Sequence, residues 1–260
     1  MKKLTDKTYW DGTYGRRKSQ PMLIVDGYAN RSNRLILGKL LEIDMQNKRI
    51  LEIGAGDSIW LPYLAKRFSS SHFVGIDYSE SGCTLLSERA SRECVNIEII
   101  HEDMFVENSL LHGSFDIIIS FGVVEHFDDL GIVLAAQRRY LKLGGVMFTL
   151  IPNMAGALGS LVHLWNHEVY DKHNPHDWAS FLRGHQQAGL DVISGGYLGS
   201  NNFGVLSSCF PERKGPSWQM YRVLVTASLA TWWIEDKVGN FPSSKTFSPY
   251  IYAISRQAHL

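Results

Sequence analysis

Two glycines, Gly54 and Gly56, end an apolar run in the segment ILEIGAGD at residues 50–57. A glycine has no Cβ, so the backbone at these positions can approach a ligand closely. A helix that starts after the turn would offer free N–H groups to the same ligand. Glu52 lies just before the glycines and suits a cationic amine better than a pyrophosphate. We therefore expect a strand-to-helix turn over a bound cofactor that carries an amine.

An acid follows each of the next two apolar runs. Asp77 comes 21 residues after Gly56 (77 − 56 = 21) and could accept hydrogen bonds from both hydroxyls of a ribose. Asp103, in HEDMF, could accept the amino group of adenine while the amide of Met104 meets a ring nitrogen. Alone, Asp103 is equally an ordinary loop or helix-cap acid. Together with Glu52 and Asp77, which also lie at the ends of apolar runs, Asp103 indicates a ligand that contains adenosine.

A nicotinamide dinucleotide competes for the same glycine turn. Its fingerprint is Gly-x-Gly-x-x-Gly, whose third glycine lets the helix pack closely on the strand. Ile59 occupies that third position here. Asp77 suits the ribose of either cofactor and does not discriminate, so the choice against a dinucleotide depends on Ile59 and Glu52.

Apolar runs alternate with helical segments through the middle of the chain, which is typical of a parallel sheet covered on both faces. With right-handed crossovers this predicts a doubly wound α/β fold, whose ligands bind beyond the carboxyl ends of the strands. The expected strands span 49–54, 72–78, 95–100, 115–122, 146–151, 190–197 and 248–255. The expected helices span 33–44, 59–68, 79–92, 130–141 (ended by Gly144 and Gly145), 155–165 and 177–188.

The length of 260 residues predicts a single domain. We divide it into an N-terminal helical cap (1–48), a cofactor-binding core (49–153), an acceptor-side lid and insertion (154–247) and a closing strand (248–260). Residues 223–234 (VLVTASLATWWI) carry no charge and are too few for a helix that spans a bilayer, which needs about 20. We predict a core helix there, with a helix lying at a membrane surface as the alternative.

Composition limits the class of partner and the compartment. The 26 basic and 26 acidic residues balance, which argues against a nucleic-acid partner. Cys83, Cys94 and Cys209 have no metal-ligand spacing and are expected to be reduced thiols. The N-terminal residues MKKLTDKTYWDG lack an apolar core, so we expect no signal peptide, a cytoplasmic location and no stable membrane insertion.

Five short motifs occur in a fixed order: LEIGAG, GIDYS, HEDMF, FDIIISFGVVEHF and LKLGGVMFTLIPN. Together they resemble the class I S-adenosylmethionine-dependent methyltransferases. The resemblance implies a Rossmann-like, mostly parallel seven-stranded sheet that ends in an antiparallel strand pair. It also implies an N-terminal segment that folds over S-adenosylmethionine. The cofactor-binding residues that it implies are Tyr9, Tyr14, Glu52, Gly54, Ala55, Gly56, Asp77, Tyr78, Asp103, Met104, Ser120 and Phe121.

Methyl transfer to a hydroxyl needs a group that takes the proton. His126, four residues beyond Gly122, is our candidate base because its ordinary pKa of about 6.5 suits proton transfer near neutrality. The alternative is a histidine that closes the loop by hydrogen bonding to backbone. Some methyltransferases bind Mg²⁺ through Glu-x-x-Glu-His at this loop, but Gly122 stands where the first Glu would be, so we predict no metal.

A cluster of aromatic and histidine residues follows the fifth strand and is expected to form a lid over the acceptor. The predicted acceptor-binding residues are Tyr14, His126, His163, His167, Tyr170 and His173. The segment after the fourth strand reads SFGV rather than the Asn/Asp-Pro-Pro-aromatic motif of amino-group methylation. We therefore expect O-methylation of a small molecule or glycan. The alternatives are a nicotinamide-dependent oxidoreductase and a non-catalytic module that binds S-adenosylmethionine.

Overall fold

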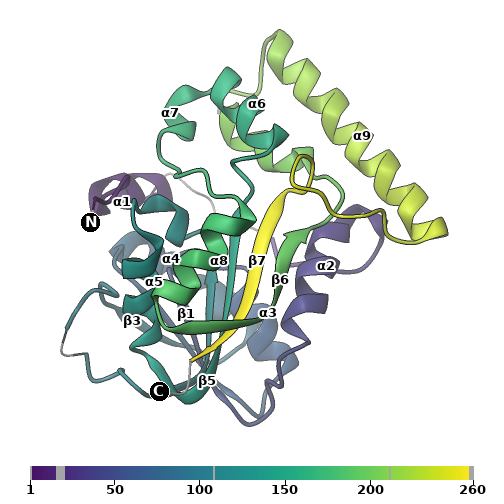
Figure 1. Cartoon of the computed structure of the whole chain (residues 1–260). Helices are drawn as coiled ribbons and strands as arrows, with labels where there is room; N and C mark the ends of the chain where they lie inside the picture. Colours follow the sequence, from purple (N-terminus) through teal and green to yellow (C-terminus); the bar gives the residue numbers. More distant parts are fainter. Residues whose placement is uncertain (1, 16–20, 108, 211, 258–260) are drawn as a thin grey trace.

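The computed structural model describes residues 2–15, 21–107, 109–210 and 212–257, and its centre is a seven-stranded sheet of order β3-β2-β1-β4-β5-β7-β6 (Figure 1). Strands β1 to β5 pair in parallel, and β7 runs antiparallel to both β5 and β6. The strands are β1 (Arg49–Ile53), β2 (His72–Asp77), β3 (Glu98–His101), β4 (Phe115–Phe121), β5 (Leu141–Pro152), β6 (Leu190–Leu198) and β7 (Tyr250–Gln257). The predicted fold class and closing strand pair are confirmed.

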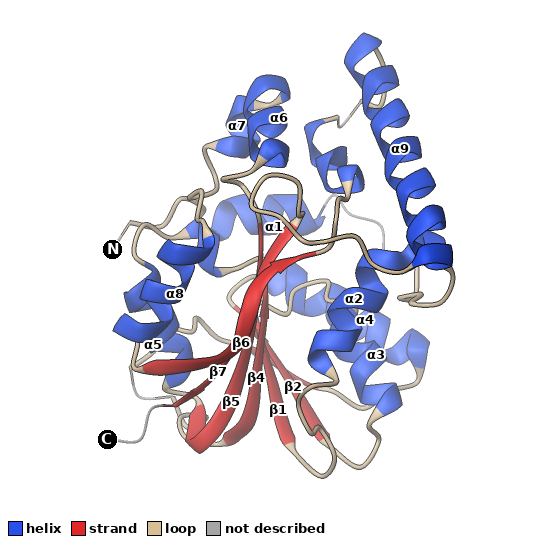
Figure 2. Ribbon diagram, turned by 45° about the vertical axis from the view of Figure 1, so that its right-hand side comes forward, coloured by secondary structure: helices blue, strands red, loops and turns tan. Residues whose placement is uncertain are grey.

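Helices cover both faces of the sheet (Figure 2). One apolar core joins the sheet to α2, α3 and α4, and the other joins it to α5 and α8. The α-helices are α1 (Lys7–Gly15), α2 (Arg31–Leu40), α3 (Trp60–Arg67), α4 (Glu80–Glu93), α5 (Leu130–Arg138), α6 (Ala157–Trp165), α7 (His167–Tyr170), α8 (Trp178–Gln187) and α9 (Pro216–Val238). The short 3-10 helices are η1 (Tyr28–Asn30), η2 (Val124–His126) and η3 (Phe203–Cys209).

The strand order reverses direction between β1 and β4, because the chain moves outward through β2 and β3 before it returns to the other side of β1. Ligands of doubly wound sheets bind at such a switch point. Side chains of β1 and β4 are almost wholly buried, which explains why these strands are nearly continuous apolar runs. The fold therefore brings the loops after Ile53 and Phe121 to one place.

The predicted boundary between the helix at 130–141 and the strand at 146–151 is wrong. Gly144 and Gly145 do not end a helix but lie inside β5, which begins at Leu141, while α5 already ends at Arg138. Leu141 pairs with Phe115 of β4 across a bulge, and Gly144 has a φ of 74°, a conformation that glycine adopts without strain. Glycine marks an irregular strand here, which the sequence pattern did not distinguish from a helix end.

The prediction of a core helix at 223–234 is also wrong. These residues belong to the longer helix α9, which lies on the surface and buries Tyr221, Ser228, Trp232 and Glu235. Val223 and Trp233 are 67% and 55% exposed. No helix among the described residues is long and apolar enough to cross a membrane.

A buried ion pair joins α9 to α2. Nε of Arg31 lies 2.8 Å from Oε2 of Glu235, and both side chains are at least 96% buried. Glu235 also accepts hydrogen bonds from the Ser200 hydroxyl and from the N–H of Phe241. Because Arg31 is buried and already has this partner, it is a structural residue of the N-terminal segment.

Removing one partner of this ion pair should destabilise the fold strongly. Glu235→Ala leaves the Arg31 cation buried without a counter-charge, which typically costs about 3–5 kcal/mol of unfolding free energy. The neighbouring Asp236 pairs with Arg34 at the surface, where 38–40% of each side chain is exposed. Asp236→Ala is therefore the matched control and should cost about 0–1 kcal/mol. Urea unfolding measures both, and equal losses would contradict the assignment.

Candidate cofactor and acceptor site

A cavity of about 320 Å³ lies at the carboxyl ends of β1, β2, β3 and β4 and is lined by five stretches of the chain. The N-terminal segment, the glycine turn, the β2 and β3 tips and the loop after β4 all contribute. The lining residues are Lys3, Thr5, Trp10, Tyr14, Glu52, Ile53, Gly54, Gly56, Asp57, Ser58, Ile59, Trp60, Ile76, Asp77, Tyr78, Glu102, Asp103, Met104, Phe105, Phe121, Gly122, Val123, His126 and Phe127. The three acids at successive strand tips thus share one cavity.

The glycine turn is too crowded for any side chain. Gly54 has a φ of 74°, and a Cβ there would lie 2.5 Å from the Val123 side chain. A Cβ at Gly56 would lie 2.7 Å from Asp77 and 2.9 Å from the Tyr14 ring. Both positions therefore require glycine, and their backbone lines the cavity directly, as the glycine spacing predicts.

Asp77, at the end of β2, is hydrogen-bonded to the glycine turn. Its two carboxylate oxygens each accept a backbone N–H at 2.8 Å, one from Gly56 and one from Ser79. Ser79 caps α4 by accepting from the N–H of Gly82. Burial raises the pKa of Asp77, and the two N–H donors oppose that rise. Each oxygen keeps a second lone pair for a hydroxyl of the ligand.

Glu52 is a buried carboxyl, and no lysine, arginine or histidine of the described residues forms an ion pair with it. Burial raises its pKa to about 8, the hydrogen bond from Ser58 lowers it, and the nearby Asp77 carboxylate raises it further. Lys3, the lysine among the described residues of the lining, pairs with Asp103 instead. An ionised Glu52 therefore needs a positive charge from another source. A cationic amine of a bound ligand fits this requirement.

Asp103 and Met104 form the far end of the cavity. Asp103 is partly exposed, pairs with Nζ of Lys3 at 2.9 Å, and accepts the N–H of Phe105 at 3.0 Å. Met104 is buried. Lys3 was not predicted to lie here, because nothing in its local sequence shows that residues 2–4 run beside the loop after β4. Leu4 donates its N–H to the His126 carbonyl and fixes this placement.

The aromatic residues of α1 divide between two places. Tyr14 is buried and lines the cavity, and Trp10 stacks on it with ring centroids 5.5 Å apart. Tyr9 does not line the cavity, and its ring lies 4.4 Å from Nζ of Lys172. Ala55 and Ser120 are also outside the lining and are packed in the core behind it, although Phe121 does line it.

His126 is a buried, neutral histidine at the edge of the cavity. Its Nδ1 lies 2.6 Å from the Lys172 carbonyl oxygen, and its ring contacts Trp10 and His173 at centroid distances of 5.3 and 4.8 Å. Burial and then His173 lower its pKa to about 4, against the raising effect of the Lys172 and Gly122 carbonyls. Because a carbonyl only accepts, Nδ1 carries the proton and Nε2 keeps the lone pair.

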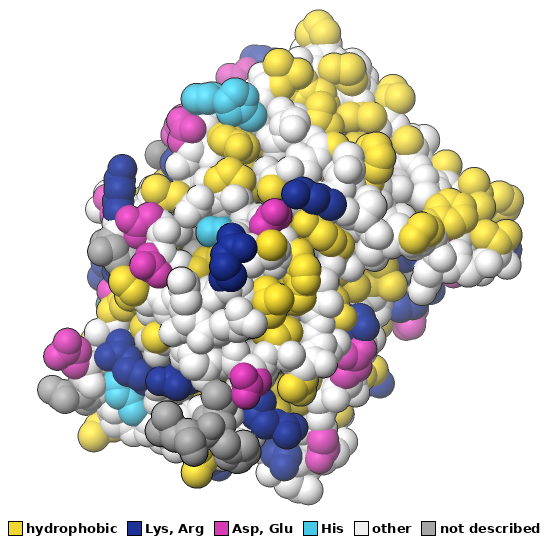
Figure 3. Space-filling model, in the orientation of Figure 1, with side chains coloured by type: hydrophobic (Ala, Val, Ile, Leu, Met, Phe, Trp, Pro, Cys, Tyr) yellow, Lys and Arg dark blue, Asp and Glu magenta, His cyan; other side chains and the backbone are white. Residues whose placement is uncertain are grey.

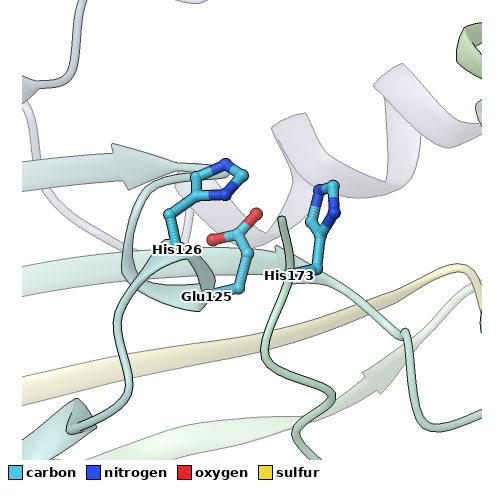
Figure 4. A group of neighbouring side chains, drawn as sticks. All are labelled: Glu125, His126 and His173. Carbon is cyan, nitrogen blue, oxygen red and sulfur yellow. The ribbon is translucent and has the colours of Figure 1, made fainter. Parts of the chain in front are cut away.

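Glu125, His126 and His173 converge beside the cavity (Figure 4). Among the described residues, they are the group whose nitrogen and carboxylate atoms lie close enough, within 4.8 Å of one another, to hold a metal ion. Burial raises the pKa of Glu125 to about 8. The Nδ1 atoms of both histidines already face backbone carbonyls, so an ion would have to use Nε2. That no metal is required remains a prediction.

The other predicted lid residues lie away from the cavity. His163 of α6 packs against His167 and Tyr170 of α7, with ring centroids 4.4 and 4.8 Å apart, and none of the three lines the cavity. His163 and His167 are exposed. Of the lid set, His173 alone comes close, through its contact with His126. The high density of histidines in the sequence suggested that this segment binds the acceptor. It could not show that the segment lies away from the cavity.

Residues 25–194, well over half of the chain, match the profile of a methyltransferase domain family. The chain belongs to this family. It is 29% identical over 127 residues to a malonyl-acyl-carrier-protein O-methyltransferase of Bacillus cereus, covering 47% of this chain and 46% of that protein. It is 27% identical over 160 residues to a ubiquinone biosynthesis O-methyltransferase of Neisseria meningitidis, covering 57% and 66%. The matches thus span about half to two thirds of these relatives.

Solved methyltransferases share the whole fold. Geranyl diphosphate C-methyltransferase of Streptomyces coelicolor, solved with Mg²⁺, geranyl diphosphate and S-adenosylhomocysteine, aligns with a TM-score of 0.57 at 15% identity. The alignment covers 97% of this chain and 96% of that one. The predicted family and cofactor are confirmed: this is a class I S-adenosylmethionine-dependent methyltransferase domain. The nicotinamide alternative is thereby set aside.

The pKa of Glu52 makes cofactor binding depend on pH. Because an amine cation favours the ionised carboxyl, binding should release a proton, and affinity should rise with pH between about pH 5.5 and 7. An α-amino group titrates near 7.7–8.0 and stays charged over that range. Glu52→Gln should weaken binding of S-adenosylhomocysteine about 10–100-fold at pH 7 and flatten the profile. Calorimetry measures the affinity across this pH range. An unchanged affinity and an unchanged dependence of affinity on pH in the variant would contradict the role of Glu52.

Proposed function

We infer that this methyltransferase domain transfers a methyl group to a hydroxyl oxygen of a small molecule or sugar, with His126 as general base. The observation that supports the role of His126 is its tautomer: the Lys172 carbonyl holds the proton at Nδ1, so a neutral Nε2 remains on a ring that lines the cavity. Two similar proteins are named as O-methyltransferases, which supports oxygen as the acceptor atom.

The residues of the cavity fit S-adenosylmethionine in three ways. Glu52 offers a buried carboxyl without an ion pair among the described residues, Asp77 offers two oriented oxygens, and the glycine turn lines the cavity with backbone that has no Cβ. When bound, the cofactor supplies a sulfonium methyl group that is already activated for in-line displacement. The remaining work of the chain is to exclude water and to align the acceptor, which can contribute about 7–11 kcal/mol.

His126 would receive the acceptor proton on Nε2. As the acceptor oxygen bonds to carbon it becomes positively charged and far more acidic than the free hydroxyl, so even a base with a pKa of about 4 can take its proton. The low pKa also keeps the ring unprotonated at neutral pH. His173 and Trp10 hold the imidazole plane, and the Lys172 carbonyl stabilises the positive charge that forms on it.

A second role for His126 comes from the same contact. The hydrogen bond to Lys172 joins the loop after β4 to the segment after α7, and the N–H of Asn174 donates to the Glu125 carbonyl beside it. His126 would then be a purely structural residue that closes the loop. A domain that binds the cofactor without catalysis would need no more than this.

Two substitutions separate these roles. His126→Ala removes both functions and should lower turnover about 10²-fold or more, with little change in cofactor affinity. His126→Asn is the matched variant, because its amide nitrogen can still donate to the Lys172 carbonyl while no base remains. A base role predicts that both variants are equally slow.

Release of S-adenosylhomocysteine over a panel of phenols, catechols and methyl glycosides measures the turnover, and calorimetry measures the cofactor affinity. Full activity of His126→Asn would assign His126 to loop closure alone. Cofactor binding by the wild-type protein with no turnover on any acceptor in the panel would favour the non-catalytic module.

A further inference from the structure

Helix α9 presents a stripe of apolar side chains to solvent. Its members are three or four residues apart, which places them on one face of the helix. They are Met220, Val223, Ala227, Ala230, Ile234 and Val238. Val223 and Val238 are 67% and 69% exposed, and Trp233, beside the stripe, is 55% exposed. In the space-filling view, hydrophobic side chains gather along α9 at the upper right of the molecule (Figure 3).

The opposite face of α9 is held to the protein by both apolar and polar contacts. Trp218, Tyr221 and Val225 pack in the apolar cluster that includes Leu206 and Phe210. Ser228 accepts the N–H of Phe203, the indole of Trp232 donates to the Asn201 carbonyl, and Glu235 pairs with Arg31. An ordinary surface helix turns its apolar face inward and its polar face to water. Helix α9 is apolar on its outer face as well as its inner face, so the exposed stripe lies outside the contacts that pack the helix on this domain.

Further apolar side chains are exposed in the segments near α9. Phe241 and Phe247, in the loop after α9, are 41% and 56% exposed, and Leu164 of the neighbouring helical layer is 72% exposed. Contiguous apolar patches of this kind on soluble domains usually mark a surface for a partner or a membrane.

The charges around the stripe favour one occupant. No charged residue occurs from 223 to 234, whereas the cations Arg222 and Lys237 lie at the two ends of this run. The nearby carboxylates are neutralised by ion pairs, because Glu235 is buried against Arg31 and Asp236 pairs with Arg34. An uncharged, tryptophan-bearing face with cationic ends is complementary to an anionic bilayer surface.

The same charges disfavour a second copy of this chain. Two α9 stripes packed in parallel would set Arg222 against Arg222, and an antiparallel pair would set Arg222 against Lys237. Like charges in such positions oppose association. A bilayer also accommodates the wider patch with Trp233 and Phe247, which a narrow helix–helix seam would leave uncovered.

We propose that α9 is an interfacial helix that docks this methyltransferase domain on the surface of an anionic lipid bilayer, with its apolar stripe at the boundary between headgroups and acyl chains. The layer of α6, α7, η3 and α9 stands beyond the end of the sheet where the parallel strands finish (Figures 1 and 2). Docking therefore brings the cavity end of the molecule toward the membrane. If the proposed function holds, the acceptor is an amphiphile that the bilayer presents.

Sedimentation of the full chain with sucrose-loaded vesicles tests the proposal. Vesicles of phosphatidylcholine with phosphatidylglycerol should bind the wild-type chain more strongly than phosphatidylcholine alone, and added salt should weaken binding. Val223→Ser with Ile234→Ser should lower the bound-to-free ratio about tenfold or more. Leu110→Ser with Leu143→Ser is the matched control, because these residues are 97% and 78% exposed outside the patch. That control should bind like the wild-type chain.

A charge variant separates the electrostatic contribution. Arg222→Gln with Lys237→Gln should lower binding to the phosphatidylglycerol vesicles while leaving the weak binding to phosphatidylcholine unchanged. Thermal unfolding and binding of S-adenosylhomocysteine should be unaffected in every variant, since all the changed residues are exposed.

Three results would overturn the proposal. The folded wild-type chain could fail to bind phosphatidylglycerol vesicles at low salt, or the stripe variant could bind as well as the control. Alternatively, light scattering could reveal a dimer that the stripe variant abolishes, with no vesicle binding, which would identify a second copy as the occupant. None of these experiments uses an acceptor, so their failure leaves the proposed methyl transfer standing.

Discussion

The cofactor site depends on the way Asp77 joins two neighbouring strand tips. Its carboxylate accepts the N–H groups of Gly56 and Ser79, so the turn after β1 and the start of α4 are fixed to one side chain. This arrangement leaves no space for a Cβ at Gly56, against which Tyr14 packs. Glu52 then lies buried behind the turn with its carboxyl short of a positive charge. The site is preorganised to bind a ligand that carries a diol and a cationic amine.

Three segments far apart in the sequence complete the site around that centre. The N-terminal residues pair with the loop after β4, where Leu4 donates to the His126 carbonyl and Lys3 reaches Asp103. From the other side, the segment after α7 supplies the Lys172 carbonyl that fixes the tautomer of His126. The core motifs therefore define only part of the acceptor side, through His126. The rest of that side is built from segments that lie outside the motifs.

The sequence predicted the structure correctly where a residue at that position has only one plausible structural role. Gly54 and Gly56 had to be close-approach positions, and acids that end buried strands had to meet at one edge of a parallel sheet. The pattern was ambiguous where a residue has several uses. Gly144 and Gly145 fit a helix end as well as an irregular strand. The uncharged run in α9 fitted a core helix because the burial of Glu235 and Ser228 on its inner face cannot be read from local sequence.

Long-range placement was beyond the sequence pattern. Lys3 and Lys172 reached the site through backbone pairing that leaves no local signal. Conversely, His163, His167 and Tyr170 formed the densest cluster of polar rings, yet they pack on one another outside the cavity. Tyr9 likewise turns toward Lys172, while its neighbour Trp10 turns inward. Spacing along the chain places residues on elements, but the packing of those elements decides which ones meet.

The central claim is that Glu52, Asp77 and Asp103 converge on one adenosyl ligand. A crystal structure of the full chain grown with S-adenosylhomocysteine tests this most directly. The account predicts one ligand in the cavity, with its amine at Glu52, its ribose hydroxyls at Asp77 and its adenine between Asp103 and Met104. A ligand bound elsewhere, or one whose ribose and amine contact neither Asp77 nor Glu52, would contradict it.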